Sequence, residues 1–367
     1  MTFTLNERIK AFSSLGSQLK ALVCAIEAGH EANLKSPAAQ HFYHEIIDAP
    51  NHNPWFTVEN VKLAVCAICE MLDNDKLKKW IGNYIHLIPE ARYEQKKVAV
   101  IMAGNIPFVG FHDFLCVLMA GHQFLGKLSA QDKKLPVALA YLLMEIEPRF
   151  GASIEFSEGP IGGFDVVIAT GSNNSARYFE HYFGKYPNII RKNRNSIAIL
   201  SGQETQEELL LLGKDVFSFF GLGCRNVSKL LFPRGYKLTE LIEAWSGFKP
   251  LGDHHKFFNN YEYFKAVYIV KRAPFVDLGF CLLREDNALS SPVSVIHYEE
   301  YPFDNWVTEY LAKETDKIQC VASNNIFPGI KTIPFGKCQK PELWDYADGN
   351  DTMNFLYSIN DLPIRTE

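Results

Sequence analysis

The sequence contains no hydrophobic run long enough to cross a membrane. Although 47% of its 367 residues are hydrophobic, charged or polar residues interrupt every apolar stretch before it reaches the roughly 18 residues that a transmembrane helix needs. The first residues, MTFTLNERIKAF, also lack the apolar core of a secretory signal peptide. We therefore expect a cytoplasmic protein without a membrane span.

Positive charge is not in excess either. The chain has 37 Lys and Arg against 42 Asp and Glu, a formal net charge of −5. Proteins that bind nucleic acid usually present a basic surface to the phosphates. We therefore expect no nucleic-acid partner.

Cysteines are too sparse for a disulfide framework, since eight are spread over the whole chain. Most stand among apolar residues and are typical of reduced core cysteines in a cytosolic protein. The one CxxC pair, Cys66 and Cys69, lies in a helix-like run without a second pair at zinc-finger spacing, which favours core packing. His254 and His255 are adjacent and so point in different directions. No metal site is predicted.

Two kinds of hydrophobic pattern divide the chain. Up to about residue 90, apolar residues recur every three or four positions, which predicts helices. From Lys97, the apolar β runs KVAVIMAG, QFLGKLS, DVVIATG and NSIAILSG alternate with helical segments. Buried strands separated by helices indicate a parallel sheet covered on both faces. We predict an α/β protein whose residues 1–202 form a helical N-terminus and a Rossmann-type, dinucleotide-binding domain.

A second series of strands and helices begins near residue 203, with the long helix QETQEELLLLGKDVFSFFG. It continues with SKLLFP, LTELIEAW, FKAVYIV, SVIHYEE, NWVTEYLAKE and IQCVAS. This predicts a second α/β domain over 203–338 and a C-terminal segment over 339–367. A hairpin near 85–96 and the apolar stretch MNFLYSI at 353–359 are predicted to add strands across a subunit interface, which makes the protein a homo-oligomer.

The segment FGLGCRNVSKLLF, at 220–232, places a cysteine in a glycine-rich bend before a β-like run. Gly221 and Gly223 permit backbone conformations that other residues avoid, which suits a tight bend presenting Cys224. Arg225 either favours the nucleophilic thiolate or pairs with a carboxylate across the domain interface. Because a free cysteine is often a small buried hydrophobe, these residues alone leave core packing open.

Three turns of the first domain follow apolar strands, where such sheets bind ligands. The Asn105 amide, in MAGNIPFVGF, can donate to an oxyanion or simply form a turn. Lys127 and Ser129, in GKLSAQD, can bind ribose or phosphate or be solvated. Gly171 and Ser172, in ATGSNNSA, can bring helix N–H groups to a phosphate or serve as a helix cap. The sequence has no GxGxxG fingerprint after these strands.

These segments, in this order, resemble acyl-CoA reductases of the aldehyde dehydrogenase superfamily, of the type of the fatty-acyl reductase subunit of bacterial bioluminescence (LuxC-like). AGNIPFVGF resembles the Asn-x-Pro segment of that superfamily, and GKLS its Lys-Pro-Ser segment with Leu128 in place of proline. ATGSNNSA resembles its Gly-Ser turn, FGLGCRNVSKLLF the stretch around its nucleophilic cysteine, and FGKCQKPELWDYADGNDTMNFL the C-terminal signature of the acyl reductases. The resemblance runs from about Lys97 to Leu356 and implies an aldehyde-dehydrogenase-like fold.

The resemblance implies the roles of the site residues. Cys224 would be the nucleophile that takes the acyl group, and Asn105 with the backbone N–H of Cys224 would form the oxyanion hole. Lys127 and Ser129 would hold the adenosine side of the cofactor.

The cofactor implied by the resemblance is NADPH. Gly171 and Ser172 would lie near its pyrophosphate and nicotinamide, and Glu285 is the nearest candidate for a contact with the nicotinamide ribose. Nothing in the sequence marks a 2′-phosphate site, to which Lys133 and Lys134 are possible contributors.

One departure from the family bears on the direction of the reaction. Oxidising aldehyde dehydrogenases carry a glutamate that activates water, but IIRKNRNSIAILSG, at 189–202, has no acidic residue. The resemblance therefore implies an oxidoreductase that reduces a fatty acyl thioester to a long-chain aldehyde, with an acyl-CoA or an acyl-protein synthetase as the donor. A CoA-acylating aldehyde dehydrogenase for short aldehydes and a non-catalytic acyl-binding subunit remain open.

Overall fold

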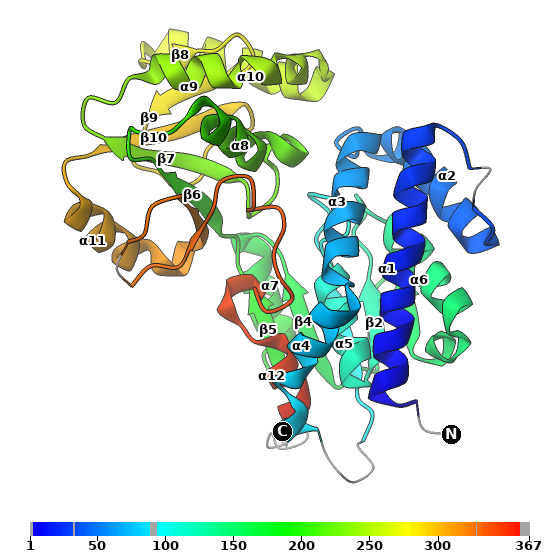
Figure 1. The fold of residues 1–367 in the computed structure, drawn as a ribbon. Coiled ribbons are helices and arrows are strands. Elements are labelled where there is room, and N and C mark those ends of the chain that lie inside the picture. Colours follow the sequence, from blue (N-terminus) through cyan, green and yellow to red (C-terminus); the bar gives the residue numbers. More distant parts are fainter. Residues whose placement is uncertain (1–2, 32–33, 89–93, 328, 360–367) are drawn as a thin grey trace. The chain divides into compact units, whose positions relative to one another are not determined.

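The computed structural model describes residues 3–31, 34–88, 94–327 and 329–359. The chain forms two compact units, one made of Met1–Asn193 with Pro341–Glu367 and the other of Arg194–Lys340. The first contains a five-stranded sheet and the second a seven-stranded sheet (Figure 1). No helix within the described ranges is long and apolar enough to cross a membrane.

Helices form the beginning of the chain, as predicted. They are α1 (Leu5–Ala28), α2 (Pro37–His52), α3 (Val58–Met71) and α4 (Asn74–Gly82). The Thr57 hydroxyl accepts a hydrogen bond from the N–H of Asn60 and so caps α3, which satisfies one of the free N–H groups of the first turn. The buried faces of α1 and α3 pack together, and α2 packs on the later helix α6 (Leu135–Ile146).

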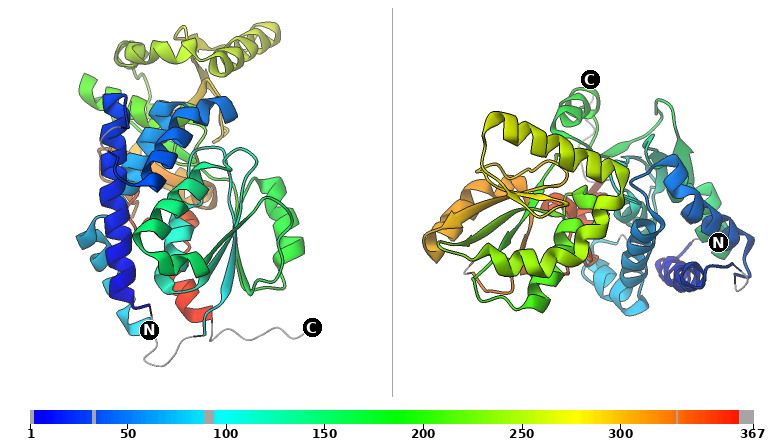
Figure 2. Two further views of the ribbon diagram at one scale, coloured as in Figure 1. Left: turned by 90° about the vertical axis from the view of Figure 1, so that its right-hand side faces the viewer. Right: turned by 90° about the horizontal axis from the view of Figure 1, so that it is seen from above.

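The sheet of the first unit is entirely parallel, in the order β3-β2-β1-β4-β5. Its strands are β1 (Lys97–Ile101), β2 (Gln123–Lys127), β3 (Ile154–Ser157), β4 (Val166–Thr170) and β5 (Asn188–Arg191). Helices α5 (Phe111–Ala120) and α6 cover one face and α7 (Asn173–Phe183) the other (Figure 2). The predicted doubly wound domain is therefore confirmed. The strand order reverses between β1 and β4, the position where such sheets bind ligands.

The sheet of the second unit has the order β12-β11-β6-β7-β10-β9-β8, and only the β8–β9 pair is antiparallel. Its strands are β6 (Asn195–Ile199), β7 (Val227–Pro233), β8 (Val276–Asp277), β9 (Leu282–Glu285), β10 (Val295–Tyr301), β11 (Ile318–Ala322) and β12 (Thr332–Ile333). Its helices are α8 (Gln206–Phe217), α9 (Leu238–Trp245), α10 (His255–Lys271) and α11 (Asp304–Glu314).

Short 3-10 segments occur in both units. Those described are η1 (Ile85–Leu87), η2 (Pro148–Ala152), η3 (Ser218–Gly221), η4 (Ser246–Asp253), η5 (Thr315–Lys317) and η6 (Ala347–Gly349).

Two segments differ from their predicted place. The strand NSIAILSG, expected in the first domain, forms β6 and pairs with β7 and β11 of the second sheet, so the units divide after Asn193 and not after residue 202. FKAVYIV, at 264–270, continues the helix α10, because Phe257, Tyr261 and Tyr268 form one buried helical face.

The prediction of a strand at MNFLYSI is wrong. Most of this stretch forms the helix α12 (Thr352–Ser358), whose Met353 and Leu356 side chains are fully buried and which packs on α5 in the same unit. The Arg191 guanidinium joins the Asp113 carboxylate at 2.6 and 2.9 Å and also donates to the Thr352 hydroxyl at 2.9 Å. Of the predicted hairpin near 85–96, residues 85–87 form the 3-10 segment η1 and not a strand, and residues 89–93 lie outside the described residues.

Candidate functional site

Cys224 lies in a loop that contains three successive residues with positive φ. Phe219, Phe220 and Gly221 have φ of 52°, 57° and 76° in succession, a left-handed conformation that glycine adopts freely and bulky residues rarely do. The loop ends at Asn226, just before β7, and the Cys224 side chain is exposed. Cys224 is therefore not one of the core cysteines of the chain.

Asn226 holds this loop from inside. Its side chain is almost fully buried; its Oδ1 accepts from the N–H of Gly223 at 2.8 Å, and its Nδ2 donates to the carbonyls of Asp215, Val216 and Ser218 at 2.8 to 3.3 Å. One amide thus pairs with backbone groups of the last turn of α8 and of the loop that follows it. Nothing in the sequence pattern indicated Asn226, because its side-chain hydrogen bonds to the backbone form only once the turn is folded.

Two further hydrogen bonds tie the loop to other segments of the second unit. The Ser196 hydroxyl, at the start of β6, donates to the carbonyl of Cys224 at 2.9 Å. The Arg225 guanidinium donates through Nε to the carbonyl of Cys338. Arg225 thus has a backbone carbonyl of the second unit as a partner. The sequence had suggested either an effect on the Cys224 thiolate or a carboxylate partner, and neither prediction included this contact.

Two further thiols lie behind the Cys224 loop. Cys320 and Cys338 are buried, and the Cys320 sulfur lies 3.0 Å from the Ser196 hydroxyl. A hydrogen bond with the Cys338 thiol lowers the pKa of Cys320, and the charge of Arg225 acts in the same direction. The positive charge of Arg225 therefore acts on buried sulfur atoms of this unit.

In the first unit, three predicted turns leave the same edge of the sheet. Ile101 at the end of β1 pairs with Lys127 at the end of β2 and with Ala169 near the end of β4. The turns that carry Asn105, Ser129 and Gly171 follow directly. The sheet therefore brings these sequence-predicted segments to one end of the strands.

The Asn105 turn fits closely onto the loop after β2. Asn105 is exposed, whereas its neighbour Gly104 packs so tightly that a Cβ atom there would overlap the Ser129 side chain. At the other end of the turn, Phe108 has a φ of 60° and donates its N–H to Oδ2 of Asp132 at 2.9 Å. Asp132, which the sequence reading had passed over, therefore contacts the predicted oxyanion segment.

Lys127 and Ser129 are both half-buried at the end of β2. The Lys127 ammonium donates to the carbonyl of Glu158, and the Ser129 hydroxyl accepts from the N–H of Gln131 at 3.2 Å. The Lys133 ammonium pairs with the Glu158 carboxylate at 2.5 Å, and this contact lowers the pKa of Glu158. Both lysine ammonium groups thus meet the same acidic residue beyond β3.

Gly171 and Ser172 connect β4 to α7. Ser172 is the N-cap of α7, and its hydroxyl accepts from the N–H of Ser175 at 3.2 Å. A Cβ atom at Gly171 would lie 2.9 Å from Phe179 and Ser175, so the glycine is needed for close packing of the helix. In the second unit, Glu285 ends β9 and is exposed.

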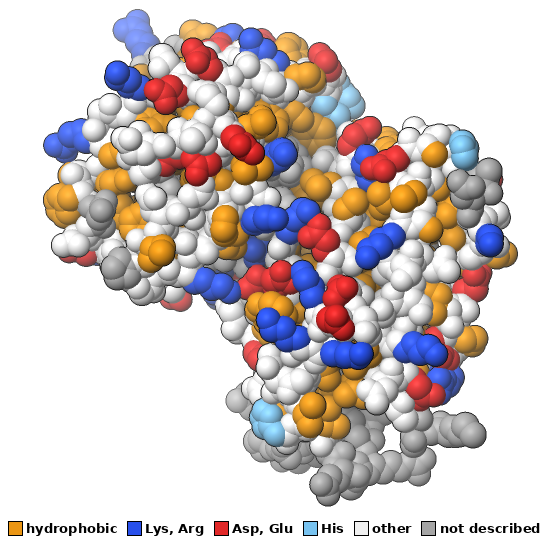
Figure 3. All heavy atoms as spheres, in the orientation of Figure 1, with side chains coloured by type: hydrophobic (Ala, Val, Ile, Leu, Met, Phe, Trp, Pro, Cys, Tyr) orange, Lys and Arg blue, Asp and Glu red, His pale blue; other side chains and the backbone are white. Residues whose placement is uncertain are grey.

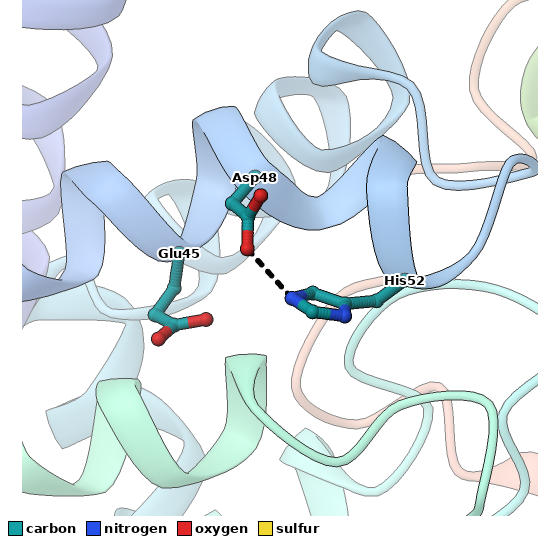
Figure 4. Close-up of side chains that lie close together, drawn as sticks. All are labelled: Glu45, Asp48 and His52. Carbon is teal, nitrogen blue, oxygen red and sulfur yellow. Dashed lines mark hydrogen bonds and ion pairs between the residues drawn. The ribbon is translucent and has the colours of Figure 1, made fainter.

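Two carboxylates and a histidine on α2 lie next to the segment that follows the Ser129 turn. Glu45, Asp48 and His52 point to one side of the helix (Figure 4), and the His52 ring lies 2.6 Å from Asp48. The Lys134 ammonium lies 3.3 Å from Glu45 and 3.6 Å from Asp48. A lysine thus already supplies the positive charge that these carboxylates attract.

On one face of the molecule, no single sign of charge dominates (Figure 3). On the face shown in Figure 3, Lys and Arg side chains are interspersed with Asp and Glu. This distribution agrees with the net charge of −5.

Comparison with known proteins supplies the fold. No family model matches the sequence, and no curated protein does. Among solved structures, aldehyde dehydrogenase 21 from Physcomitrella patens, in complex with succinate, superposes with a TM-score of 0.62 at 10% identity over 96% of this chain and 88% of its own. An E. coli NADP-dependent enzyme gives 0.59 at 13% identity over 90% and 84% of the two chains. A Mycobacterium tuberculosis aldehyde dehydrogenase complexed with NAD+ gives 0.57 at 15% identity over 88% and 77%. The chain therefore has the aldehyde dehydrogenase fold.

Proposed function

We propose that this protein is an oxidoreductase that reduces a fatty acyl thioester to the aldehyde with NADPH, through an S-acyl intermediate on Cys224. The observation that carries the proposal is the exposed Cys224 on a strained, internally tethered loop in a chain with the aldehyde dehydrogenase fold. A loop held by Asn226 and Ser196 is suited to presenting one thiol in a fixed geometry. Structural cysteines are usually buried instead.

The residues of the first unit fit a nicotinamide dinucleotide. The parallel strands end together at the point where the strand order reverses, and Ser172 caps a helix there whose first N–H groups favour negative charge. In this proposal Lys127 and Ser129 hold the adenosine side, Gly171 and Ser172 the pyrophosphate side, and the exposed Glu285 the nicotinamide ribose. NADPH, when bound, supplies the hydride that reduces the acyl carbon.

Acyl transfer is the step that this chain's own residues carry out. The Cys224 thiolate attacks the thioester carbonyl, and the Asn105 amide and the Cys224 N–H donate to the oxyanion that forms. When the carbonyl re-forms, the bond to the leaving thiol breaks, that thiol takes a proton from water, and the acyl group stays on Cys224. After reduction, the bond between this carbon and the Cys224 sulfur breaks, which releases the aldehyde and restores the thiolate.

The proposed direction of the reaction rests on the segment from β5 to the turn after β6. Residues 189–202 contain no carboxylate that could activate water. An acyl-enzyme without such a base next to it hydrolyses slowly, which leaves time for hydride transfer. The absence thus supports reduction over the hydrolytic oxidation of aldehydes.

The test is NADPH consumption with acyl-CoAs from short to long chains, by the wild type and by Cys224→Ala and Asn105→Ala. We expect activity on long chains, its abolition in Cys224→Ala, and a loss on the order of 10²-fold in Asn105→Ala. Activity only with short aldehydes, CoA and NADP+ would favour a CoA-acylating dehydrogenase. No turnover in either direction and no acyl adduct on Cys224 by intact mass would favour a non-catalytic acyl-binding subunit.

Two partners belong to the same proposal. The acyl group comes either from acyl-CoA or from a partner protein such as an acyl-protein synthetase. Comparing free acyl-CoA with a protein-bound acyl donor in the same assay separates them. Self-association into a homo-oligomer is checked by light scattering.

A further inference from the structure

A buried carboxylate lies beneath the Asn105 turn. The Asp132 side chain is only 5% exposed. Its Oδ2 accepts the N–H of Phe108 at 2.9 Å, while its Oδ1 is buried and has no hydrogen-bond partner among the described residues. Burying a carboxylate with one of its oxygen atoms unpaired is costly, so its single contact with Phe108 needs an explanation.

That contact closes one end of the turn that carries Asn105. At the near end, Gly104 packs against the Ser129 side chain. At the far end, the Phe108 backbone is left-handed and its N–H is held by Asp132. Asp132 in turn donates its own N–H to the carbonyl of Ser129 at 3.2 Å. The Gly104–Phe108 turn is therefore fastened at both ends to the 129–132 segment.

We propose that Asp132 is a positioning residue that holds the Gly104–Phe108 turn on the 129–132 segment and so sets the place of the Asn105 amide. This inference rests on the proposed function, in which Asn105 stabilises the oxyanion and Lys127 and Ser129 contact the cofactor. Asp132 itself touches neither reacting group. It links the segment assigned to the cofactor with the segment assigned to the acyl group.

The surroundings of Asp132 make this hold depend on pH. Burial raises its pKa to about 7. It lines a pocket of about 140 Å³ into which Glu45 and His52 project from α2, and Lys133 and Lys134 from its own segment. Both lysines already pair with other carboxylates. A carboxylate accepts a backbone N–H more strongly than a carboxylic acid does, so the hold on Phe108 tightens as pH rises through about 7.

Two variants separate the hydrogen bond from the charge. Asp132→Ala removes the acceptor, and we expect a loss of kcat of roughly 10- to 100-fold, since a misplacement of about 1 Å costs up to 10². Asp132→Asn keeps an acceptor oxygen without the titration, so it should recover most of kcat and flatten the wild-type pH profile around pH 7. His52→Gln, which changes a histidine that lines the same pocket without contacting Phe108, is the control and should keep the wild-type profile.

The measurements distinguish this inference from the proposed function. We would determine kcat and KM for NADPH between about pH 5.5 and 9, together with amide hydrogen exchange at Phe108. In a wild type that turns over and loses about 10²-fold activity in Asn105→Ala, an Asp132→Ala variant within twofold of wild type overturns the inference. If the wild type does not turn over, the proposed function fails, and exchange at Phe108 decides: faster exchange in Asp132→Ala and near-normal exchange in Asp132→Asn support the hold.

Misfolding of Asp132→Ala would not prevent a decision. Asp132→Asn then serves alone, and a wild-type pH profile in that variant, or unchanged pH dependence of Phe108 exchange, overturns the inference. Circular dichroism of each variant identifies this case.

Discussion

At the scale of single residues, the Cys224 loop depends on the chemistry of one amide. The Nδ2 of Asn226 faces three backbone carbonyls, and its Oδ1 faces one N–H. An amide offers two donors and an acceptor, but an ionised carboxylate only accepts. The near-isosteric change Asn226→Asp therefore places negative oxygen against three carbonyl oxygens.

We expect Asn226→Asp to lower the free energy of unfolding by about 1–3 kcal/mol and to change the alkylation rate of Cys224. Asn260→Asp is a matched control, because the Nδ2 of Asn260 makes one bond, to the carbonyl of Lys256 at 2.8 Å. Chemical denaturation and timed iodoacetamide labelling measure the two effects. An equal loss of stability in both variants would show that the hydrogen bonds of Asn226 contribute no more to stability than the bond of Asn260.

The exposure of the cysteines predicts their order of modification. Cys24 and Cys224 are exposed and Cys66 is half-buried, whereas the other five are buried. Burial raises the pKa of Cys116 and Cys281 well above the ordinary value, which leaves little thiolate to react.

Native alkylation followed by peptide mass mapping should therefore find Cys24 and Cys224 first and Cys116 and Cys281 only after unfolding. Early modification of Cys116 or Cys281 would contradict the described packing. Comparing Cys224 in the wild type and in Arg225→Met also tests whether Arg225 favours the Cys224 thiolate.

At the scale of elements, a buried carboxylate joins α8 to the segment after β12. Asp215 accepts the N–H groups of Gly336 and Cys338 at 2.6 and 2.9 Å. Burial raises its pKa to about 6 from 3.8, although these two hydrogen bonds act against the rise. The folded state therefore keeps a proton on Asp215 at pH values where the unfolded chain has lost it.

The raised pKa of Asp215 makes the free energy of unfolding depend on pH. Between about pH 4 and 6 the folded state binds more protons than the unfolded state, so this group's contribution to stability falls as pH rises and is constant above about 6. The shift of about two units corresponds to at most about 3 kcal/mol. We expect Asp215→Asn to remove this part of the slope in denaturation curves measured from pH 4 to 8. An unchanged slope would show that Asp215 does not titrate in this range.

The elements also show what the sequence can predict. Strands β1, β2 and β4 of the first sheet were recognised because buried parallel strands are apolar on both faces, a pattern that KVAVI and VVIAT carry. Strands β3 and β5 were not predicted, because IEFS and NIIR are four-residue runs that include polar residues. Strand β6 has the same apolar pattern as β1 and β4, but nothing in its residues tells which sheet it joins, since that depends on pairing with β11 more than a hundred residues later. The helix at 264–270 was missed because its β-branched residues resemble a strand, while its helical face is set by Phe257 and Tyr261 upstream.

The same limit applies to the site. Cys224, Asn105 and Lys127 could be selected because each follows a recognisable strand or glycine bend. Asp132 could not, because its hydrogen bond exists only where two loops approach each other in the folded unit. Asn226 could not, because its hydrogen bonds exist only once the turn between α8 and β7 has folded.

At the scale of the whole molecule, the first unit is built from both ends of the chain. Residues from 341 onward return to it: the Tyr346 hydroxyl accepts from the Trp80 indole at 2.7 Å, and the Tyr84 hydroxyl donates to Asp351 at 2.8 Å. The second unit, Arg194–Lys340, is continuous in sequence.

We therefore expect residues 194–340 to fold when expressed alone, and residues 1–193 alone to lack cooperative unfolding. Fusing 341–367 to 193 through a flexible linker should restore a cooperative transition in the first unit. Thermal unfolding followed by circular dichroism measures all three. Cooperative unfolding of 1–193 alone would show that α12 is dispensable.

The buried Arg191 also links the body of the first unit to its C-terminal segment, since it pairs with Asp113 and donates to Thr352. One substitution tests its contribution to stability. Arg191→Met leaves Asp113, itself 4% exposed, without its bidentate partner, and removing one member of a buried ion pair costs about 3–5 kcal/mol. The double variant Arg191→Met with Asp113→Leu should recover part of this loss. Denaturation of the single and double variants tests this, and equal loss in both would contradict it.

The return of α12 to the first unit also bears on how the protein is made. A ribosome releases the chain from its N-terminus, and domains generally fold in that order. Here the second unit is complete once Lys340 has emerged, while the first unit still waits for its last helix. The order of completion during translation is thus the reverse of the order of synthesis, and until α12 emerges the nascent first unit exposes the apolar surface of α5 on which α12 later packs.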